Sequence, residues 1–135
     1  HIALIFYALF AVLCFILFVV PERRDLTGSY YRGDHAGYNI YLDLLPDGTY
    51  KAEWLGCLGS YGAARGTWKS AGSKIVFYPS EEKGKMKGHL RELNIVRNYW
   101  RTAFVPDLNN EYYRKYGPDE YSAFYRRSRP WFVLP

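Results

Sequence analysis

Cysteine and histidine are scarce in this chain of 135 residues, and their scarcity excludes several kinds of site. The sequence holds two cysteines and three histidines. Cys14 lies in an apolar run near the start, so Cys57 has no partner for a disulfide in the rest of the chain. A zinc site needs several thiol or imidazole ligands at regular spacing, which the sequence does not offer. We therefore predict no metal site and no cofactor.

The remaining cysteine is the residue most open to a chemical role. Cys57 lies between Gly56 and Gly59, which leave its thiol little cover. A nucleophilic thiol needs a base within reach, and neither His35 nor His89 stands at a recognisable spacing from it. We therefore predict that Cys57 is a small buried residue in a tight β corner.

Other residue types also lack a catalytic arrangement. Asp34, Asp43 and Glu53 are candidates for an acid/base pair, but Asp43 and Glu53 fall on the outward face of one expected hairpin, where carboxylates are solvated. The glycines from Gly56 to Gly66 are not followed by Gly-Lys-Ser/Thr, so they do not form a phosphate loop. No catalytic residues are predicted, and the protein is not expected to be an enzyme.

Charge, proline and glycine are absent from the nineteen residues between Ile2 and Val20. A helix of that length spans roughly 28 Å, close to the hydrocarbon core of a bilayer. A buried core helix and a cleaved signal peptide are the alternatives, but the run lacks a polar stripe and ends without small residues. We predict a transmembrane helix over 1–20, followed by a linker over 21–27. The predicted membrane-spanning residues include Ile2, Phe6, Phe10, Phe15 and Val20.

Two features of the sequence give opposing indications of the side of the membrane on which the domain lies. Arg23, Arg24 and Arg32 follow the helix, and the positive-inside rule taken alone places the domain in the cytoplasm. The sequence begins at His1 rather than Met, and charges upstream of it would reverse that count. A short N-terminus before an apolar anchor is also a common way to export a tethered domain. We favour a periplasmic domain on a single-pass protein.

The 115 residues after the helix are enough for one domain, over 28–135, and not for two. They hold all of the charged residues, with a net charge of +5, and 21 of the 26 aromatic residues. Aromatic residues at this density favour strands and large contact surfaces. The basic balance suits anionic headgroups or an acidic partner. No nucleic-acid motif is present, so a nucleic-acid partner is not expected.

Turn signals recur about every ten residues and predict short antiparallel strands. The clearest hairpin runs from Tyr38 to Leu55 and turns at Pro46-Asp47-Gly48-Thr49. Glu81 to Gly88 reads as a mobile basic loop, and Asp107 to Tyr116 as a short helix capped by Asp107 or Asn109. The fold class is therefore all-β: a small antiparallel meander barrel or sandwich behind one N-terminal transmembrane helix. Further strands are expected at 29–32, 64–70, 74–78, 90–96, 99–105 and 121–126.

The first half of the domain resembles a family of small bacterial proteins. The shared pattern is Gly33-Asp34 with Gly37 and Asn39, then Asp47-Gly48-Thr49-Tyr50, then Trp54 to Gly62, then Gly66-Thr67-Trp68. The resemblance implies a membrane-anchored or exported lipocalin-like β domain, often behind an apolar segment, and it implies no activity. Together with the predicted transmembrane helix, a bacterial source indicates the inner membrane. His35 stands where the family often has glycine.

The end of the chain has the composition of an interface. A basic cluster leads into an apolar, aromatic end, which suits a lipid interface or a groove on a partner; an edge strand of the barrel is the alternative. Tyrosine and arginine near residues 112–116 are also typical of interfaces. The candidate partner or lipid interface consists of Tyr112, Tyr113, Arg114, Tyr116, Arg126, Arg127, Arg129, Trp131 and Phe132.

These observations predict a non-enzymatic accessory subunit of a larger membrane protein complex. Its expected partners are the lipid bilayer and other subunits of that complex. The alternative is a lipocalin-like module that binds an apolar ligand, a lipid or pigment, inside the barrel. The packing of the barrel interior discriminates between the two.

Overall fold

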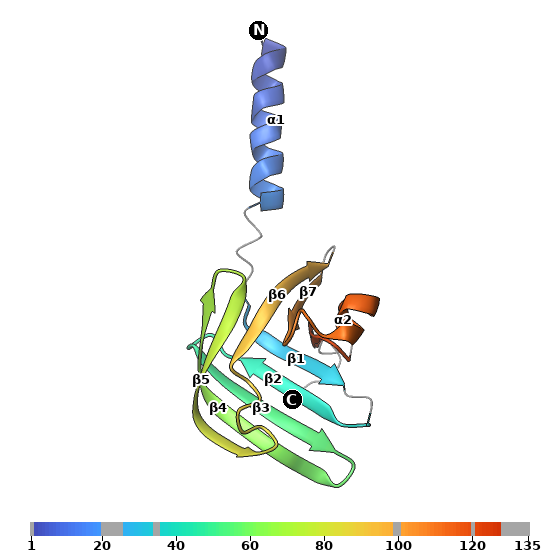
Figure 1. The fold of residues 1–135 in the computed structure, drawn as a ribbon. Coiled ribbons are helices and arrows are strands. Elements are labelled where there is room, and N and C mark those ends of the chain that lie inside the picture. The colour runs from blue at the N-terminus through green and yellow to red at the C-terminus, as the bar shows by residue number, and fades with distance from the viewer. Residues whose placement is uncertain (1, 20–25, 34–35, 99–100, 120, 128–135) are drawn as a thin grey trace, which may run out of the picture.

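A computed structural model describes residues 2–19, 26–33, 36–98, 101–119 and 121–127 (Figure 1). Helix α1 comes first and is followed by strands, with α2 before the last of them. The elements are α1 (Ile2–Val19), β1 (Gly28–Gly33), β2 (Asn39–Leu44), β3 (Thr49–Gly56), β4 (Gly59–Ala71), β5 (Lys74–Gly84), β6 (Glu92–Asn98), β7 (Arg101–Val105), α2 (Glu111–Tyr116) and β8 (Phe124–Arg126).

The strands form a closed barrel in sequence order, and every neighbouring pair is antiparallel. Pairing of β1 with β8, in which Tyr31 lies opposite Tyr125, closes the barrel. The predicted all-β fold is confirmed. Of the two predicted architectures, barrel and sandwich, the chain forms the barrel. Closure pairs both edges of the sheet, which otherwise expose unpaired backbone groups.

The predicted hairpin from Tyr38 to Leu55 is confirmed, with β2 and β3 as its strands and the turn where it was expected. Leu44 lies opposite Tyr50, and the pairing continues to Asn39 and Leu55. The Asp47 carboxylate accepts hydrogen bonds from the backbone N–H of Thr49 at 2.9 Å and from its hydroxyl at 2.6 Å. An aspartate that bonds two residues ahead fixes the turn that sets the hairpin register.

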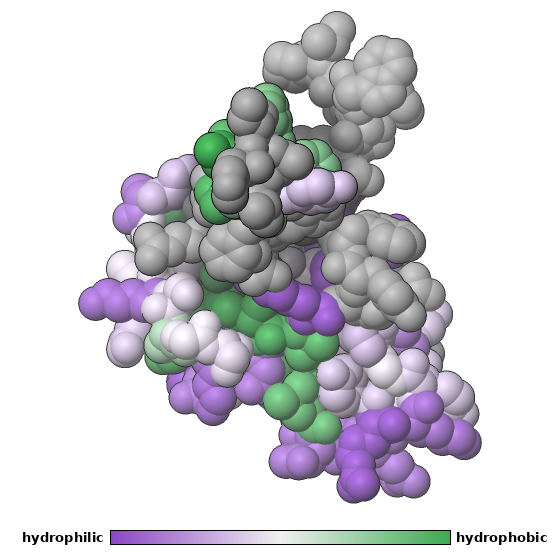
Figure 2. All heavy atoms as spheres, turned by 90° about the horizontal axis from the view of Figure 1, so that it is seen from above, coloured by the Kyte–Doolittle hydropathy of each residue, from purple (hydrophilic) through white to green (hydrophobic). Residues whose placement is uncertain are grey.

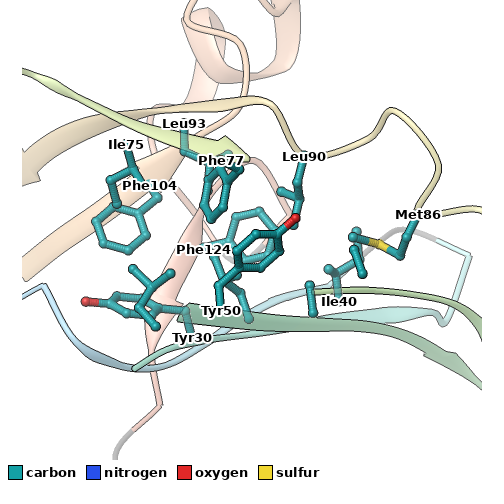
Figure 3. Packing of buried hydrophobic residues seen from close by; sticks show 14 residues of the cluster. Tyr30, Ile40, Tyr50, Ile75, Phe77, Met86, Leu90, Leu93, Phe104 and Phe124 are labelled. Atoms are coloured by element: carbon teal, nitrogen blue, oxygen red, sulfur yellow. The ribbon is translucent and has the colours of Figure 1, made fainter. Parts of the chain in front are cut away.

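Aromatic side chains from several walls of the barrel fill its interior. The rings of Tyr30 and Phe104 lie 4.3 Å apart, and those of Tyr50 and Phe77 lie 4.9 Å apart in an edge-to-face arrangement. All four are at most 3% exposed. Figure 3 shows these side chains pointing toward one another, with Met86 and Leu90 covering one side of the cluster. The interior is therefore a packed core of the kind that stabilises small barrels.

The segment predicted as a mobile basic loop, Glu81 to Gly88, is instead part of the barrel and its cover. Strand β5 continues to Gly84, and the turn after it donates a hydrogen bond from the Lys85 N–H to the Tyr61 carbonyl at 3.0 Å. Met86 is 0% exposed and Leu90 is 1% exposed. The prediction was wrong because one apolar side chain among the lysines carries the segment into the core.

Helix α2 is shorter than predicted and has a different cap. It begins at Glu111, and the Asn110 side chain accepts hydrogen bonds from the N–H groups of Tyr112 and Tyr113 at 2.9 and 3.2 Å. Asp107, a predicted cap, instead accepts from the N–H of Asn109 at 2.8 Å. Strand ends also differ from the prediction: β4 begins at Gly59, and β8 is confined to Phe124–Arg126.

Candidate functional site

Helix α1 presents large apolar side chains that no other described residue covers. Seven of them between Ile5 and Leu13 are 52% to 78% exposed, and none belongs to the described core clusters. Ideal α-helical geometry gives this 18-residue helix a length of roughly 27 Å. Within the described part of the chain, no helix was found to be long and apolar enough to cross a membrane.

The order of the strands divides the turns between two ends of the barrel. Because sequential antiparallel strands alternate in direction, every second turn lies at the same end. The start of β1, the β2–β3, β4–β5 and β6–β7 turns and the end of β8 share one end. Only residues 20–27 separate α1 from β1, so this end lies within roughly 27 Å of the helix along the chain.

This end, which we call the basic end, carries an excess of positive charge. Within a few residues of its turns lie seven cationic and three anionic described side chains, a net charge of +4 (7 − 3). Figure 2, seen from above, shows hydrophilic residues around the periphery and hydrophobic residues toward the middle. The cations are Lys51, Lys69, Lys74, Arg97, Arg101, Arg126 and Arg127, and the anions are Asp43, Asp47 and Glu92.

A cleft of about 420 Å³ opens at the basic end; we call it the β1 cleft. Its walls are the chain entering β1 (Thr27–Ser29), the end of β2 and the turn after it (Asp43–Pro46), and the end of β8. Arg126 and Arg127 both line it. The cleft therefore combines positive charge and hydroxyl groups with the apolar side chains of the β2–β3 turn.

Arg126 is held in place along the start of β1. Its Nη2 donates to the carbonyl oxygen of Thr27 at 2.8 Å and to the hydroxyl of Tyr30 at 3.3 Å. Gly28 lies beside this side chain with φ +139°, and a Cβ there would be in ordinary contact with Arg126 Nε, at 3.4 Å. A side chain at position 28 would therefore strain the backbone.

Arg127 lines the cleft and is exposed. Its backbone N–H donates to the Ser29 carbonyl at 2.8 Å, which fixes the position of the residue against β1. The guanidinium carbon lies 5.8 Å from the centre of the Tyr41 ring. Among the described residues, Arg127 has no carboxylate within salt-bridge distance. Its guanidinium can therefore receive an anion.

The tyrosines and arginine predicted as an interface on α2 lie on the connection between β7 and β8. Tyr116 is 58% exposed and its ring lies 4.8 Å from that of Tyr112. Tyr113 is partly buried against a small cluster with Val105 and Ala123, so it is largely structural. Arg114 is exposed. Two tyrosine rings and one arginine thus form the accessible part of this predicted interface.

Tyr112 is bound to an acid that follows α2. Its hydroxyl donates to Asp119 Oδ2 at 2.7 Å, and this hydrogen bond, together with burial, raises the pKa of Tyr112 to about 12. Burial alone would raise the pKa of Asp119. Hydrogen bonds from the Tyr112 hydroxyl and from the N–H groups of Tyr121 and Ser122 outweigh burial and lower that pKa. This network fixes the β7–β8 connection.

The structure separates the predicted interface into two places. The α2 residues follow the end of β7 that points away from the basic end, whereas Arg126 and Arg127 lie at the basic end. Arg129, Trp131 and Phe132 lie outside the described residues. Sequence reasoning missed the cations that join Arg126 and Arg127, although the alternation of hairpin turns would have placed Lys74 and Arg101 at the same end.

Cys57 is exposed in the β3–β4 turn, so the prediction that it is buried was wrong. The turn projects beyond the paired strands, and its neighbour Leu58 is 91% exposed. The described residues hold no group of three or more side chains placed to bind a metal ion. His35 and Asp34 lie outside the described residues.

At the end of the barrel opposite the basic end, Lys85 contacts three aromatic rings. Lys85 Nζ lies 5.0 Å from the ring centre of Tyr38, 5.6 Å from that of Trp54 and 5.4 Å from that of Tyr61. Trp54 also packs edge-on against His89, with 4.8 Å between ring centres. These contacts attach the segment after β5 to β3 and β4, which is a structural role.

A second hollow, of about 490 Å³, lies over the outer face of β2 to β5. Asp43 and Glu53 both line it, as the prediction that they face outward requires. Asp43 lies opposite Lys51 and Glu53 opposite Tyr41, so the two carboxylates are not neighbours across the hairpin. Arg65 and Lys83 each contact Glu81, at 2.5 and 2.7 Å. The charges of this face largely satisfy one another.

Comparison of the chain with known proteins found no matching family model, no matching curated protein and no matching solved structure.

Proposed function

We propose that this protein is a non-enzymatic accessory subunit of a larger membrane protein complex. Its N-terminal helix lies in the inner membrane among the helices of that complex, and its barrel stands in the periplasm. One observation carries the proposal: the large side chains of α1 between Ile5 and Leu13 are exposed and apolar, and the barrel does not cover them. Exposed apolar surface of this kind needs a lipid or protein environment.

The apolar run of the sequence supports a membrane environment over a soluble partner. It extends without charge from Ile2 to Val20, beyond the side chains that the structure describes. A helix that docks on a soluble partner would keep a polar stripe toward water, and the sequence has none. The resemblance to small bacterial lipocalin-like proteins behind an apolar segment is consistent with this location.

The packed core favours the accessory subunit over the alternative of a barrel that holds an apolar ligand. Tyr30, Tyr50, Phe77, Phe104 and Phe124 occupy the interior and are at most 3% exposed. Two hollows among the described residues, of about 490 and 420 Å³, lie on the outer face and at the basic end. A lipid or pigment inside the barrel would have to displace several of these rings.

Detergent extraction from the native membrane tests the proposal. In a mild detergent, we expect the full chain to elute at the size of an assembly with other membrane proteins, in a constant ratio across the peak. Tyr116→Ala together with Arg114→Ala should weaken the assembly, since these are exposed residues of the predicted interface on α2. Tyr78→Ala, on the exposed outer face of β5, is the matched control. A stable lone monomer would overturn the proposal.

A further inference from the structure

We propose that the β1 cleft binds the phosphate of an anionic phospholipid headgroup. The inference rests on the proposed membrane anchoring, because the bilayer supplies the lipid. The cleft lies at the barrel end to which the chain from α1 leads. Its own residues, and not the helix, provide the recognition.

The guanidinium groups of the cleft match the chemistry of a phosphate diester. Arginine binds phosphate oxygens through two parallel N–H donors. Arg127 supplies the accessible fork, while Arg126 is fixed along β1 by its bonds to Thr27 and Tyr30. The backbone bond from Arg127 to Ser29 fixes the main chain of Arg127 at the cleft. The Arg126 side chain and the Arg127 main chain are therefore held in place before a phosphate arrives, which reduces the entropy cost of binding.

The remaining walls suit the glycerol part of a lipid better than a small soluble anion. Leu45 and Pro46 give the cleft an apolar side on the β2–β3 turn, beside the buried Leu44. Trp68 holds that wall in place, since its Nε1 donates to the Leu45 carbonyl at 3.3 Å. A headgroup whose phosphate contacts Arg127 can rest its glycerol carbons on this wall. A free phosphate ion has no carbon atoms that could contact this wall.

One carboxylate opposes the anion. Asp43 lines the cleft and disfavours a second negative charge. The net charge of +4 at the basic end outweighs it, so an anionic headgroup remains the preferred ligand. Removing the carboxylate should therefore strengthen binding and not weaken it.

The test uses the full chain in a neutral detergent, where short-chain lipids reach the cleft whether or not the helix has entered a bilayer. The protein is titrated with dihexanoylphosphatidylglycerol, dihexanoylphosphatidylcholine or glycerol 3-phosphate. The amide NMR signals of Gly28 and Ser29 report binding. We expect saturable shifts with the phosphatidylglycerol and at least about tenfold weaker binding of the other two probes.

Four variants identify the residues responsible. Arg127→Gln should weaken phosphatidylglycerol binding about tenfold, and Arg127→Lys should weaken it less, because it keeps the charge but loses the fork. Asp43→Asn should strengthen binding. Arg114→Gln, which removes an equal charge on α2, should leave it unchanged. The amide spectrum away from the cleft shows whether each variant keeps its fold.

Three results would overturn the inference. Equal binding of phosphatidylcholine would show that the cleft does not select an anion. Equal binding of glycerol 3-phosphate would assign the site to a soluble phosphate ester. An equal loss in Arg114→Gln would reduce the effect to overall charge. Flotation of the full chain with neutral vesicles tests the anchor separately, so failure of the anchor and failure of the cleft give different results.

Discussion

The hydroxyl of Tyr30 donates a 2.7 Å hydrogen bond to the carbonyl oxygen of Leu26, four residues earlier in the chain. The ring of Tyr30 packs on Phe104 inside the barrel. This residue therefore joins the core to the segment that leads from α1 into β1. The same hydroxyl accepts a bond from Arg126, so the core, the entering chain and the β1 cleft share one contact point.

Removing the Tyr30 hydroxyl should destabilise the segment that leads into β1. We expect Tyr30→Phe to keep the ring packing and to lower the free energy of unfolding by about 1 kcal/mol, or somewhat more because two hydrogen bonds are lost. Amide hydrogen exchange between Thr27 and Ser29 should become faster. Chemical denaturation in detergent and exchange mass spectrometry measure the two effects. Tyr78→Phe, at an exposed position on β5, should change neither.

The segment after β5 should behave as part of the core. Met86→Ala removes a fully buried side chain and should lower the free energy of unfolding by about 2–5 kcal/mol. Met86→Leu keeps the volume and should cost less than about 1.5 kcal/mol. If the segment were a mobile loop, as its lysines and glycines suggest, the two variants would unfold at the same denaturant concentration as the native chain.

Alternation along strands made the β2–β3 hairpin predictable, because one buried face fixes the register of a strand pair. The same reasoning failed at Met86 and Cys57. Local composition cannot reveal that a single methionine reaches the core, nor that the glycines around Cys57 extend a hairpin turn into solvent. The basic end also could not be predicted from single segments. Arg126 reaches Thr27 and Tyr30 only because β8 pairs with β1 and closes the barrel. The predicted α2 helix was found, but its cap depended on which of Asp107, Asn109 and Asn110 reaches the first free N–H groups.

Lys85 should stabilise the end of the barrel away from the basic end. Lys85→Gln removes the ammonium from three aromatic rings, and at an exposed site such contacts contribute roughly 0.5–1 kcal/mol. Exchange of the Lys85 and Met86 amides should become faster, because their bonds to Tyr61 and Lys83 open more often. Lys87→Gln removes an equal charge two residues away. If both variants accelerate exchange equally, general repulsion and not the aromatic contact explains the effect.

The hydrogen bond between Tyr112 and Asp119 should be visible in a titration. The folded pKa of Tyr112 is raised from 10.0 to about 12, so the stabilisation is complete below pH 10 and is lost as the pH rises toward 12. The pKa of Asp119 is lowered in the fold, so its contribution is present above its unfolded value and is lost as the pH falls through the folded value. The ring carbon signal of Tyr112 follows the first change directly. Asp119→Asn should move its midpoint back toward 10, whereas Asp107→Asn should leave it in place.

The exposed thiol of Cys57 offers a direct test of the side of the membrane that the barrel occupies. In a bacterium that produces the full chain, a membrane-impermeant maleimide added to spheroplasts should label Cys57 if the domain is periplasmic, because the thiol lies in an exposed turn. Inverted membrane vesicles should then stay unlabelled until detergent is added. Cys57→Ser should abolish labelling in both preparations, which excludes reaction at Cys14 in the apolar run. Labelling of inverted vesicles alone would place the barrel in the cytoplasm. That result would agree with the positive-inside rule, which places the arginines that follow the helix on the cytoplasmic side.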